Sequence, residues 1–413
     1  METNASIFRA YDIRGKYGEE FDNEFARKLG MVLAKYLSAK KIVISRDARA
    51  SSKELAEHVS EGIISAGCDA IDIGPTSTPL FYFGVIDEKS DGGIMVTASH
   101  LGDEFNGFKI TRKKAVAIGG DELFAKTANL FDSELKAAQV PGKVLTRDLL
   151  AHYVATMVER SGLQVGDINV PIRLMGNEMI LKEARAMARE LSIPVVEKGE
   201  EISFEFDADG DRLYVYNSKG KKISGDLMGG LLAGYYFSGQ KIVYDLGYSR
   251  GVLEYLHSKD IETISSPIGH TLIKARMREH KAEFCGERSG HIFFEDTGYV
   301  EAPLLASLKI LNILQTTGHS IDELVLPISK WSTSEEINFT FSNRKKITEI
   351  ISKIREYYND ADINETDGIR AEYPDWSFLL RASNTEEKLR LIVDARTEKL
   401  LRTKVQELQK RIG

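Results

Sequence analysis

The sequence of 413 residues contains only two cysteines, Cys68 and Cys285, which are too few for a framework of disulfide bonds. Its most apolar stretch, residues 227–237, falls well short of the ~20 residues that a membrane-spanning helix needs. The first residues lack the basic region and apolar run of a signal peptide. These absences predict a protein of the reducing cytoplasm that does not bind a membrane.

Charge of one sign is not concentrated anywhere in the chain. Lys and Arg number 55 against 62 Asp and Glu, which leaves a net charge of −7 without a basic stripe. Nucleic acid is therefore not an expected partner.

The length predicts roughly two to four domains of about 100–200 residues each. A monomer and a homodimer both remain open.

Strands and helices alternate over the first three quarters of the sequence. An apolar strand at 41–45 precedes a helix at 52–66, which Ser51 and Glu54 would open as a capping box, and a strand at 69–73 follows. This order is typical of a βαβ unit and a mainly parallel sheet. Weaker versions of the pattern occur at 170–196 and 241–265. Three tandem mixed α/β domains are the resulting prediction.

The last part of the chain has a different pattern. A helix is expected at 346–357, strands at 376–380 and 390–393, and a closing helix at 399–412. Helices that flank neighbouring strands indicate an α+β domain rather than another βαβ unit. No long linker rich in Gly, Ser or Pro separates these parts.

The first loop with chemical potential has the sequence Thr97-Ala98-Ser99-His100 and follows an expected strand at 94–97. Asn106-Gly107 is a strong turn signal, so we expect the chain to fold back there and bring Lys109 near Ser99. A serine hydroxyl is a weak nucleophile that needs a neighbouring base or cation. The alternative is a strand end whose hydroxyl groups bind the backbone.

The second loop carries Asp207, Asp209 and Asp211 around Gly210, between expected strands at 203–206 and 213–216. Three carboxylates on a tight turn can converge on one hard cation, and magnesium is the first choice where the substrate is a phosphate. An EF-hand would need Gly at position six and Glu at position twelve, where Arg212 and Ser218 stand. The remaining alternative is a solvated acidic turn.

The third loop is Gly286-Glu287-Arg288-Ser289-Gly290-His291. Glycines bracket three polar side chains, which suits the recognition of sugar hydroxyl groups. His291 in this loop and His270 upstream could act as general acid or base, although either histidine by itself is more often structural.

The fourth loop runs from Arg381 to Thr385 between two expected strands, and Arg390 follows it. Its guanidinium fork and neutral donors suit a phosphate dianion. A polar β-turn explains the same residues equally well.

In their order along the chain, the four loops resemble the TASH, DxDxDR, GExSGH and RxSNT motifs of the α-D-phosphohexomutase superfamily. Residues 8–15 (FRAYDIRG) are a fifth match. Residues 269–274 (GHTLIK) and 366–384 are similar to the phosphomannomutase/phosphoglucomutase branch. The resemblance covers almost the whole chain.

This resemblance implies four domains around a central cleft, the first three mixed α/β and the fourth α+β. Placed on this chain, the domains are residues 1–140, 141–237, 238–328 and 329–413. It also implies an intramolecular phosphotransferase that interconverts hexose 1-phosphate and hexose 6-phosphate, of mannose or glucose, through a sugar 1,6-bisphosphate. The same bisphosphate would serve as the primer.

The resemblance implies a role for each matching residue. Ser99 would carry the phosphoryl group, and a phosphoserine oxygen would bind magnesium together with Asp207, Asp209 and Asp211. Arg14, Lys109 and His291 would lie near the transferred proton, and His100 and Arg212 would support the site. The substrate would contact His270, Glu287, Ser289, Arg381, Ser383, Asn384, Thr385 and Arg390.

Several residues depart from the family pattern. Leu101-Gly102 replaces the usual Asn-Pro, Ala208 a glycine and Arg288 a methionine, while Gly247 stands where a lysine often contacts substrate. Glu387 replaces a proline, and a segment before the second loop is missing from the second domain. Three alternatives stay open: a phosphoglucosamine mutase, an enzyme that makes or hydrolyses the sugar bisphosphate, and a non-catalytic sugar-phosphate-binding protein.

Overall fold

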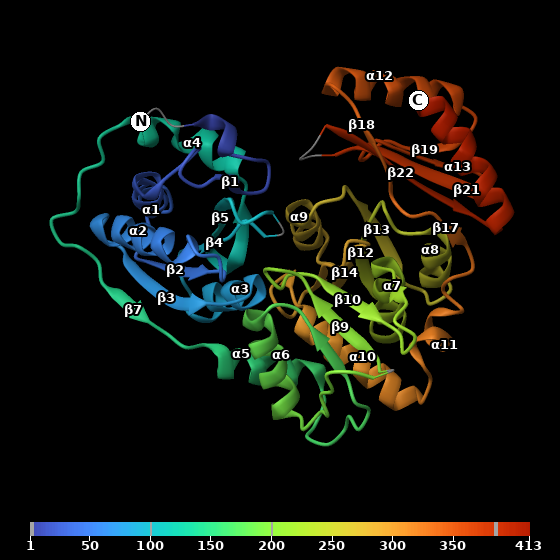
Figure 1. The fold of residues 1–413 in the computed structure, drawn as a ribbon, viewed down its shortest axis with the longest axis horizontal. Coiled ribbons are helices and arrows are strands. Elements are labelled where there is room, and N and C mark those ends of the chain that lie inside the picture. The colour runs from blue at the N-terminus through green and yellow to red at the C-terminus, as the bar shows by residue number, and fades with distance from the viewer. Residues whose placement is uncertain (1–3, 100, 200, 384–386) are drawn as a thin grey trace. The chain divides into compact units, whose positions relative to one another are not determined.

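The computed structural model describes residues 4–99, 101–199, 201–383 and 387–413 (Figure 1). The chain forms two compact units. Unit 1 comprises residues 1–222 and 296–316, and unit 2 comprises residues 223–295 and 317–413. Within the described ranges, no helix is long and apolar enough to span a membrane.

Unit 1 begins with a sheet of strand order β1-β5-β4-β2-β3-β7, to which β6 adds by pairing with β5. Strands β2, β3, β4 and β7 pair in parallel, whereas β5 is antiparallel to β4 and β1. Every residue of β4 is buried, as expected for a central strand covered on both faces. The strands are β1 (Ile13–Lys16), β2 (Lys41–Arg46), β3 (Asp69–Pro75), β4 (Gly92–Val96), β5 (Phe105–Arg112), β6 (Val116–Ile118) and β7 (Val144–Thr146).

Four α-helices accompany this sheet: α1 (Asn23–Tyr36), α2 (Ser52–Ser65), α3 (Thr78–Asp87) and α4 (Gly120–Asp132). Two short 3-10 helices, η1 (Ala5–Ile7) and η2 (Lys113–Ala115), complete this part. Helix α2 begins as expected, but the predicted capping box is wrong. Ser51 has helical backbone angles and makes no capping hydrogen bond, because its hydroxyl accepts from the Asn106 amide at 2.8 Å instead.

The turn expected at Asn106-Gly107 is also wrong, since both residues lie inside β5. The Asn106 side chain is fully buried and donates to the hydroxyl groups of Ser51 and Ser52. A Cβ atom on Gly107 would lie only 2.1 Å from the Ile13 carbonyl oxygen, so this glycine permits the close pairing of β1 with β5. The chain reverses before residue 105, and β5 still returns antiparallel to β4.

The rest of unit 1 contains a smaller sheet in which β9 pairs with β8 and β10. Helices α5 and α6 pack together beside it. The predicted strand near residue 195 is only a single bridge from Val195 to Ile172. The elements are α5 (Leu150–Ser161), β8 (Arg173–Met175), α6 (Glu178–Glu190), β9 (Ser203–Phe206), β10 (Leu213–Tyr216), β16 (Val300–Glu301) and α10 (Pro303–Thr317); β11 (Lys222–Ile223) lies where the chain enters unit 2.

Unit 2 contains a sheet with the order β13-β12-β14-β15. Strand β12 is parallel to β13 and β14, as the βαβ pattern predicts, and β15 is antiparallel to β14. The elements are α7 (Gly225–Tyr236), β12 (Lys241–Asp245), α8 (Arg250–His257), β13 (Glu262–Ser266), α9 (His270–His280), β14 (Phe284–Gly286), β15 (Ile292–Phe294) and α11 (Ile321–Val325).

The C-terminal part of unit 2 has an antiparallel sheet of order β17-β22-β21-β20-β19, with β18 also paired to β22. Helix α12 packs on β21 and α13 on β22 (Figure 1). This confirms the α+β pattern predicted for the tail. The elements are β17 (Ser332–Thr333), β18 (Ile337–Thr340), α12 (Arg344–Tyr357), β19 (Asp362–Asn364), β20 (Ile369–Glu372), β21 (Trp376–Ala382), β22 (Lys388–Ala395) and α13 (Glu398–Ile412).

Candidate active site

The serine loop, residues 97–105, leaves the buried end of β4 in unit 1. Ser99 has a φ of 54°, a left-handed conformation that is uncommon for a residue other than glycine. Its N–H donates to the Thr97 hydroxyl at 2.9 Å, and its own hydroxyl donates to Asp209 Oδ1 at 3.0 Å. Ser99 is buried. The fold therefore brings the predicted nucleophile to a predicted metal ligand that is distant in sequence.

The aspartate loop, residues 207–212, connects the antiparallel strands β9 and β10. Gly210, with a φ of 72°, makes the tight reversal possible. One carboxylate oxygen from each of Asp207, Asp209 and Asp211 lies within 4.8 Å of the other two. Asp209 and Asp211 are buried. Three converging carboxylates form the kind of oxygen site that a magnesium ion requires, so the residues fit this cofactor.

Lys109 reaches the aspartate loop from β5. Its Nζ donates to Asp209 Oδ2 and to Asp211 Oδ2, both at 2.7 Å. Burial by itself would lower the pKa of this ammonium group, but the two carboxylates outweigh burial and raise the pKa well above its usual value. Lys109 is therefore a cation here, and it neutralises part of the negative charge of the loop.

Helices α3 and α6 hold the aspartate loop in place. At the start of α3, the Thr78 N–H donates to the Asp209 carbonyl at 2.8 Å and the Thr78 hydroxyl donates to Asp209 Oδ2 at 3.1 Å. Asn177, the N-cap of α6, donates to the Ala208 carbonyl at 2.6 Å. The loop is thus fixed by elements on both sides of it.

Arg14 and Arg212 also belong to this part of unit 1. Arg14 on β1 pairs with Gly107 on β5. Gly107 is two residues before Lys109, so the two positions share one face of β5. The guanidinium group of Arg14 also forms an ion pair with Asp12 at 2.5 Å. The N–H of Arg212 donates to Asp207 Oδ1 at 3.1 Å. His100 lies outside the described residues.

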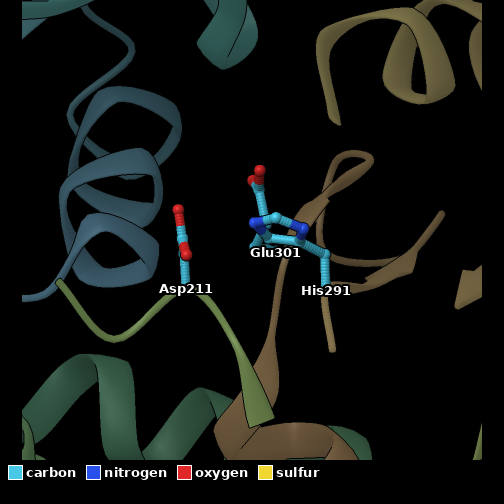
Figure 2. A group of neighbouring side chains, drawn as sticks. All are labelled: Asp211, His291 and Glu301. Atoms are coloured by element: carbon cyan, nitrogen blue, oxygen red, sulfur yellow. The ribbon is translucent and has the colours of Figure 1, made fainter. Parts of the chain in front are cut away.

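Glu301 is not among the residues that the sequence predicts for the site, but it lies beside the aspartate loop. It is buried, and one of its carboxylate oxygens lies within 4.8 Å of an oxygen of Asp211 in the same unit (Figure 2). Burial, and after it the charge of Glu301, raises the pKa of the buried Tyr82 well above its usual value. The available signal was a single acidic residue between the apolar residues Val300 and Ala302, just before a helix.

The sugar loop, residues 286–291, is a tight turn between β14 and β15 in unit 2. The Glu287 N–H donates to the His291 carbonyl at 2.8 Å, and Glu287 Oε2 lies 2.5 Å from His291 Nδ1 and 3.2 Å from the Ser289 hydroxyl. Figure 2 shows the side chain of His291. The His270 ring, also in unit 2, stacks on the His291 ring with the ring centroids 5.8 Å apart. The loop and the upstream histidine therefore form one polar cluster.

Gly247 and Arg288, which both depart from the family pattern, are in contact with each other. A Cβ atom on Gly247 would lie 3.7 Å from both Cβ and Cδ of Arg288, so the arginine side chain covers this glycine. Arg288 also donates to the Ser334 carbonyl at 2.9 Å. Asp245 accepts from the N–H groups of Gly247 and Arg288, and burial, followed by the charge of Glu287, raises its pKa to about 7.

The residues predicted to form the phosphate loop, 381–385, begin inside β21, which ends at Ala382. Arg381 and Arg390 face each other across the β21–β22 ladder. Arg381 binds Asp367 at 3.0 Å, and Arg390 lies 3.6 Å from Glu336. Ser383 is buried, and its N–H donates to the Lys388 carbonyl at 2.8 Å. Asn384 and Thr385 lie outside the described residues.

Models of the phosphoglucomutase/phosphomannomutase family match three parts of the chain. The alpha/beta/alpha domain I matches residues 5–135, the alpha/beta/alpha domain III residues 224–330, and the C-terminal domain residues 336–410. The motif resemblance is therefore confirmed at the level of the family.

Individual relatives agree along nearly the whole chain. A phosphomannomutase of Methanocaldococcus jannaschii is 33% identical over 442 residues, covering 98% of this chain and 97% of that protein. A phosphomannomutase of Vibrio cholerae is 31% identical, covering 98% of each chain. The first alignment is longer than this chain, so that relative contains residues that are absent here. Our placement of this loss in the second domain stays a prediction.

A solved structure extends the likeness to the fold. The phosphoglucomutase/phosphomannomutase family protein from Burkholderia thailandensis has a TM-score of 0.86 and 28% identity, covering 99% of this chain and 97% of that one. The four-domain α/β and α+β architecture is therefore confirmed. The chain belongs to the phosphoglucomutase/phosphomannomutase family of phosphohexomutases, and it is an isomerase that acts by phosphoryl transfer.

Proposed function

We propose that this phosphohexomutase interconverts the 1- and 6-phosphates of mannose or glucose, or of both, through a phosphoserine at Ser99 and a sugar 1,6-bisphosphate. The observation that carries the proposal is the hydrogen bond of 3.0 Å from the Ser99 hydroxyl to Asp209, beside the buried Lys109 ammonium. A phosphorylatable hydroxyl, a cation and converging carboxylates are the groups that phosphoryl transfer needs.

In the first half-reaction, the P–O bond to Ser99 Oγ breaks and a P–O bond to the free hydroxyl of the sugar phosphate forms. The sugar hydroxyl loses its proton to a base, and Ser99 regains a proton. Asp207, Asp209 and Asp211, with a phosphoserine oxygen, would hold magnesium, which supplies neutralisation of charge on the transferred group. The second half-reaction returns the other phosphate to Ser99.

The contacts of Lys109 and His291 indicate which of them could donate or accept the proton that moves during transfer. Lys109 is held as an ammonium ion by two carboxylates, so it suits charge stabilisation and proton donation rather than proton removal. Hydrogen bonding of His291 Nδ1 to Glu287 favours the tautomer with its proton on Nδ1, which makes Nε2 the basic atom. His291 is therefore our candidate for the base, and Arg14 for electrostatic support.

Substrate binding is assigned to unit 2. Glu287 and Ser289 would bind sugar hydroxyl groups, with His270 beside them, and Arg381, Ser383, Asn384, Thr385 and Arg390 would bind the phosphate of the substrate. In support, Arg381 and Arg390 are directly opposite each other and each has a carboxylate nearby, which a phosphate dianion can displace.

We also propose further properties of the protein. These are the domain boundaries at residues 140, 237 and 328, a cytoplasmic location, a monomer or homodimer, and a bisphosphate primer. Among the alternatives, a phosphoglucosamine mutase and a bisphosphate synthase or phosphatase are retained as test outcomes. The non-catalytic alternative is dropped, because the chain belongs to an enzyme family.

The test follows phosphate and turnover in the wild type, in Ser99→Ala and in Ser133→Ala, a control serine exposed at the end of α4. Each protein is primed with glucose 1,6-bisphosphate and assayed with magnesium on the 1-phosphates of mannose, glucose and glucosamine. We expect Ser99→Ala alone to lose covalent phosphate and nearly all turnover. Retention of both would overturn the nucleophile, conversion of glucosamine phosphate alone would favour that mutase, and accumulation of free bisphosphate would favour the synthase.

A further inference from the structure

Arg49 binds the serine loop through the backbone. Its Nη2 donates to the carbonyl oxygens of Ser99 at 2.8 Å and Leu101 at 2.7 Å, and its Nη1 donates to those of Gly102 at 2.8 Å and Phe105 at 3.3 Å. Only 12% of its side chain is exposed. One guanidinium group therefore serves four carbonyl groups within seven residues.

The position of Arg49 is fixed by Asp47 at the end of β2. Arg49 Nε donates to Asp47 Oδ2 at 3.1 Å, and its backbone N–H donates to Asp47 Oδ1 at 3.0 Å. The Ser52 hydroxyl donates to the same carboxylate at 2.5 Å. The N–H of Asp47 donates to the carbonyl of Val96, the last residue of β4. Arg49 is thus tied to the strand from which the serine loop departs.

The loop has a physical need for this group. Ser99 is held in a left-handed conformation, which costs on the order of 1 kcal/mol or more and persists only where the surroundings determine it. Buried carbonyl groups also need donors. Backbone donors within the loop serve the carbonyl of Gly102 through Phe105, at 3.1 Å, and the carbonyl of Ala98. Arg49 adds charged donors to the carbonyl groups of Ser99, Leu101, Gly102 and Phe105.

An arginine suits this task because its planar fork presents donors in fixed directions. A lysine at the same place would offer a flexible point charge, with fewer donors and a shorter reach. The replacement Arg49→Lys should therefore keep the charge but hold the loop less firmly.

We propose that Arg49 is a positioning residue for phosphoryl transfer, which fixes the backbone at Ser99 and at residues 101–105 so that Ser99 Oγ remains directed at the aspartate loop. The proposal rests on the proposed function of Ser99. It does not make Arg49 a catalytic residue, because its hydrogen bonds to the loop are to carbonyl oxygens and its further contact there is a 4.0 Å ion pair with the exposed Asp103.

The experiment compares the wild type with Arg49→Met, Arg49→Lys and Arg112→Met. Arg112 is a control arginine of unit 1 whose partly exposed side chain forms an ion pair with Glu122. Intact mass gives the phosphorylated fraction after priming with glucose 1,6-bisphosphate. Turnover is then expressed per mole of phosphorylated enzyme, which removes losses caused by unfolded protein.

We expect kcat per phosphorylated enzyme to fall about 10- to 100-fold in Arg49→Met, because small displacements of reacting groups are costly. The KM should change by less than about threefold, since substrate binding is assigned to unit 2. Arg49→Lys should recover part of the loss, and Arg112→Met should match the wild type. Wild-type kcat in Arg49→Met would overturn the proposal; if that variant does not fold, Arg49→Lys decides in the same way.

Hydrogen exchange of residues 97–107 separates this proposal from the proposed function. The amides of this segment should exchange faster in Arg49→Met than in the wild type, while segments of unit 2 stay unchanged. If these amides exchange at the same rate in Arg49→Met and in the wild type, Arg49 does not fix the loop, whatever the activity of the variant. Faster exchange in Arg49→Met, together with a wild-type protein that accepts no phosphate on Ser99, would support the positioning of the loop by Arg49 and reject the proposed function.

Discussion

The ammonium group of Lys109 lies 2.7 Å from a carboxylate oxygen of Asp209. It lies at the same distance from Asp211, and all three side chains are almost fully buried. In the described structure, the charge of the lysine thus opposes the repulsion among the carboxylates of the aspartate loop. A magnesium ion bound by these carboxylates would share that task. The contribution of Lys109 to stability should therefore depend on magnesium.

The replacement Lys109→Met tests this dependence. Removing one partner of a buried ion pair costs about 3–5 kcal/mol, because a buried charge is left uncompensated. We expect a lower free energy of unfolding without magnesium and a larger rise in Tm on adding magnesium than the wild type shows. Thermal unfolding with and without magnesium chloride measures both. Equal magnesium-induced shifts in the two proteins would contradict the shared role.

Replacing Asp209 by asparagine should weaken activation by magnesium. The apparent affinity for the ion should fall at least about tenfold, which corresponds to about 1.4 kcal/mol. Titration of activity with magnesium gives this affinity. Asp132→Asn is the matched control, because Asp132 is exposed at the end of α4 in the same unit. If both variants require the same magnesium concentration as the wild type, the aspartate loop is not the metal site.

Glu183 on α6 should make stability depend on pH. Its carboxylate accepts from the N–H and hydroxyl of Ser77, but burial outweighs these bonds and raises its pKa from 4.5 to about 7. Between these values the folded state holds more protons than the unfolded state, so the free energy of unfolding falls as pH rises, by about 3 kcal/mol.

Glu183→Gln cannot ionise and should lack this loss of stability. Denaturant unfolding at pH 5 and pH 8 gives the free energies of both proteins. The buried Asp245, whose pKa is also raised to about 7, contributes equally to both and cancels in the comparison. Parallel pH profiles for the two proteins would show that Glu183 does not titrate in this range.

Arg288→Met should loosen the sugar loop. The variant loses charged hydrogen bonds to the carbonyls of Gly247 and Ser334, worth about 1–3 kcal/mol. We expect a higher KM for the sugar phosphate and a changed preference between mannose and glucose. The level of Ser99 phosphorylation should not change. Arg276→Met, at a partly exposed arginine of unit 2, is the control. An unchanged KM in Arg288→Met would assign Arg288 a purely structural role.

Much of the fold follows from local patterns. The boundaries of β9 and β10 were predicted to the residue, and α2, α12, α13 and β12 lie where the apolar periodicity places them. The errors arose where local signals compete with tertiary contacts. Asn-Gly indicated a turn at residue 106, but the buried Asn106 amide bonds Ser51 and Ser52 and keeps the pair within β5. The same contact removed the capping role of Ser51.

Some residues of the candidate site could be predicted from the sequence, and others could be recognised only from the tertiary structure. The sequence motifs predict Ser99, Lys109 and the three aspartates as site residues, because the residue type alone determines which chemical group each one carries. Arg49 and Glu301 carry no such mark. Arg49 acts through the carbonyl groups of a loop about 50 residues away, and the importance of Glu301 depends on its burial near Asp211.

The sequence alone determined the chemical inventory, the α/β and α+β order of elements and the family, since these depend on residue types and their spacing. The tertiary structure decided which groups meet: Ser99 with Asp209, Lys109 with two carboxylates, and Arg288 with Gly247. Burial and pKa are also tertiary properties, because they depend on how many atoms and charges from distant segments surround a group. Lys109 becomes a fixed cation only where the fold buries it against the aspartate loop.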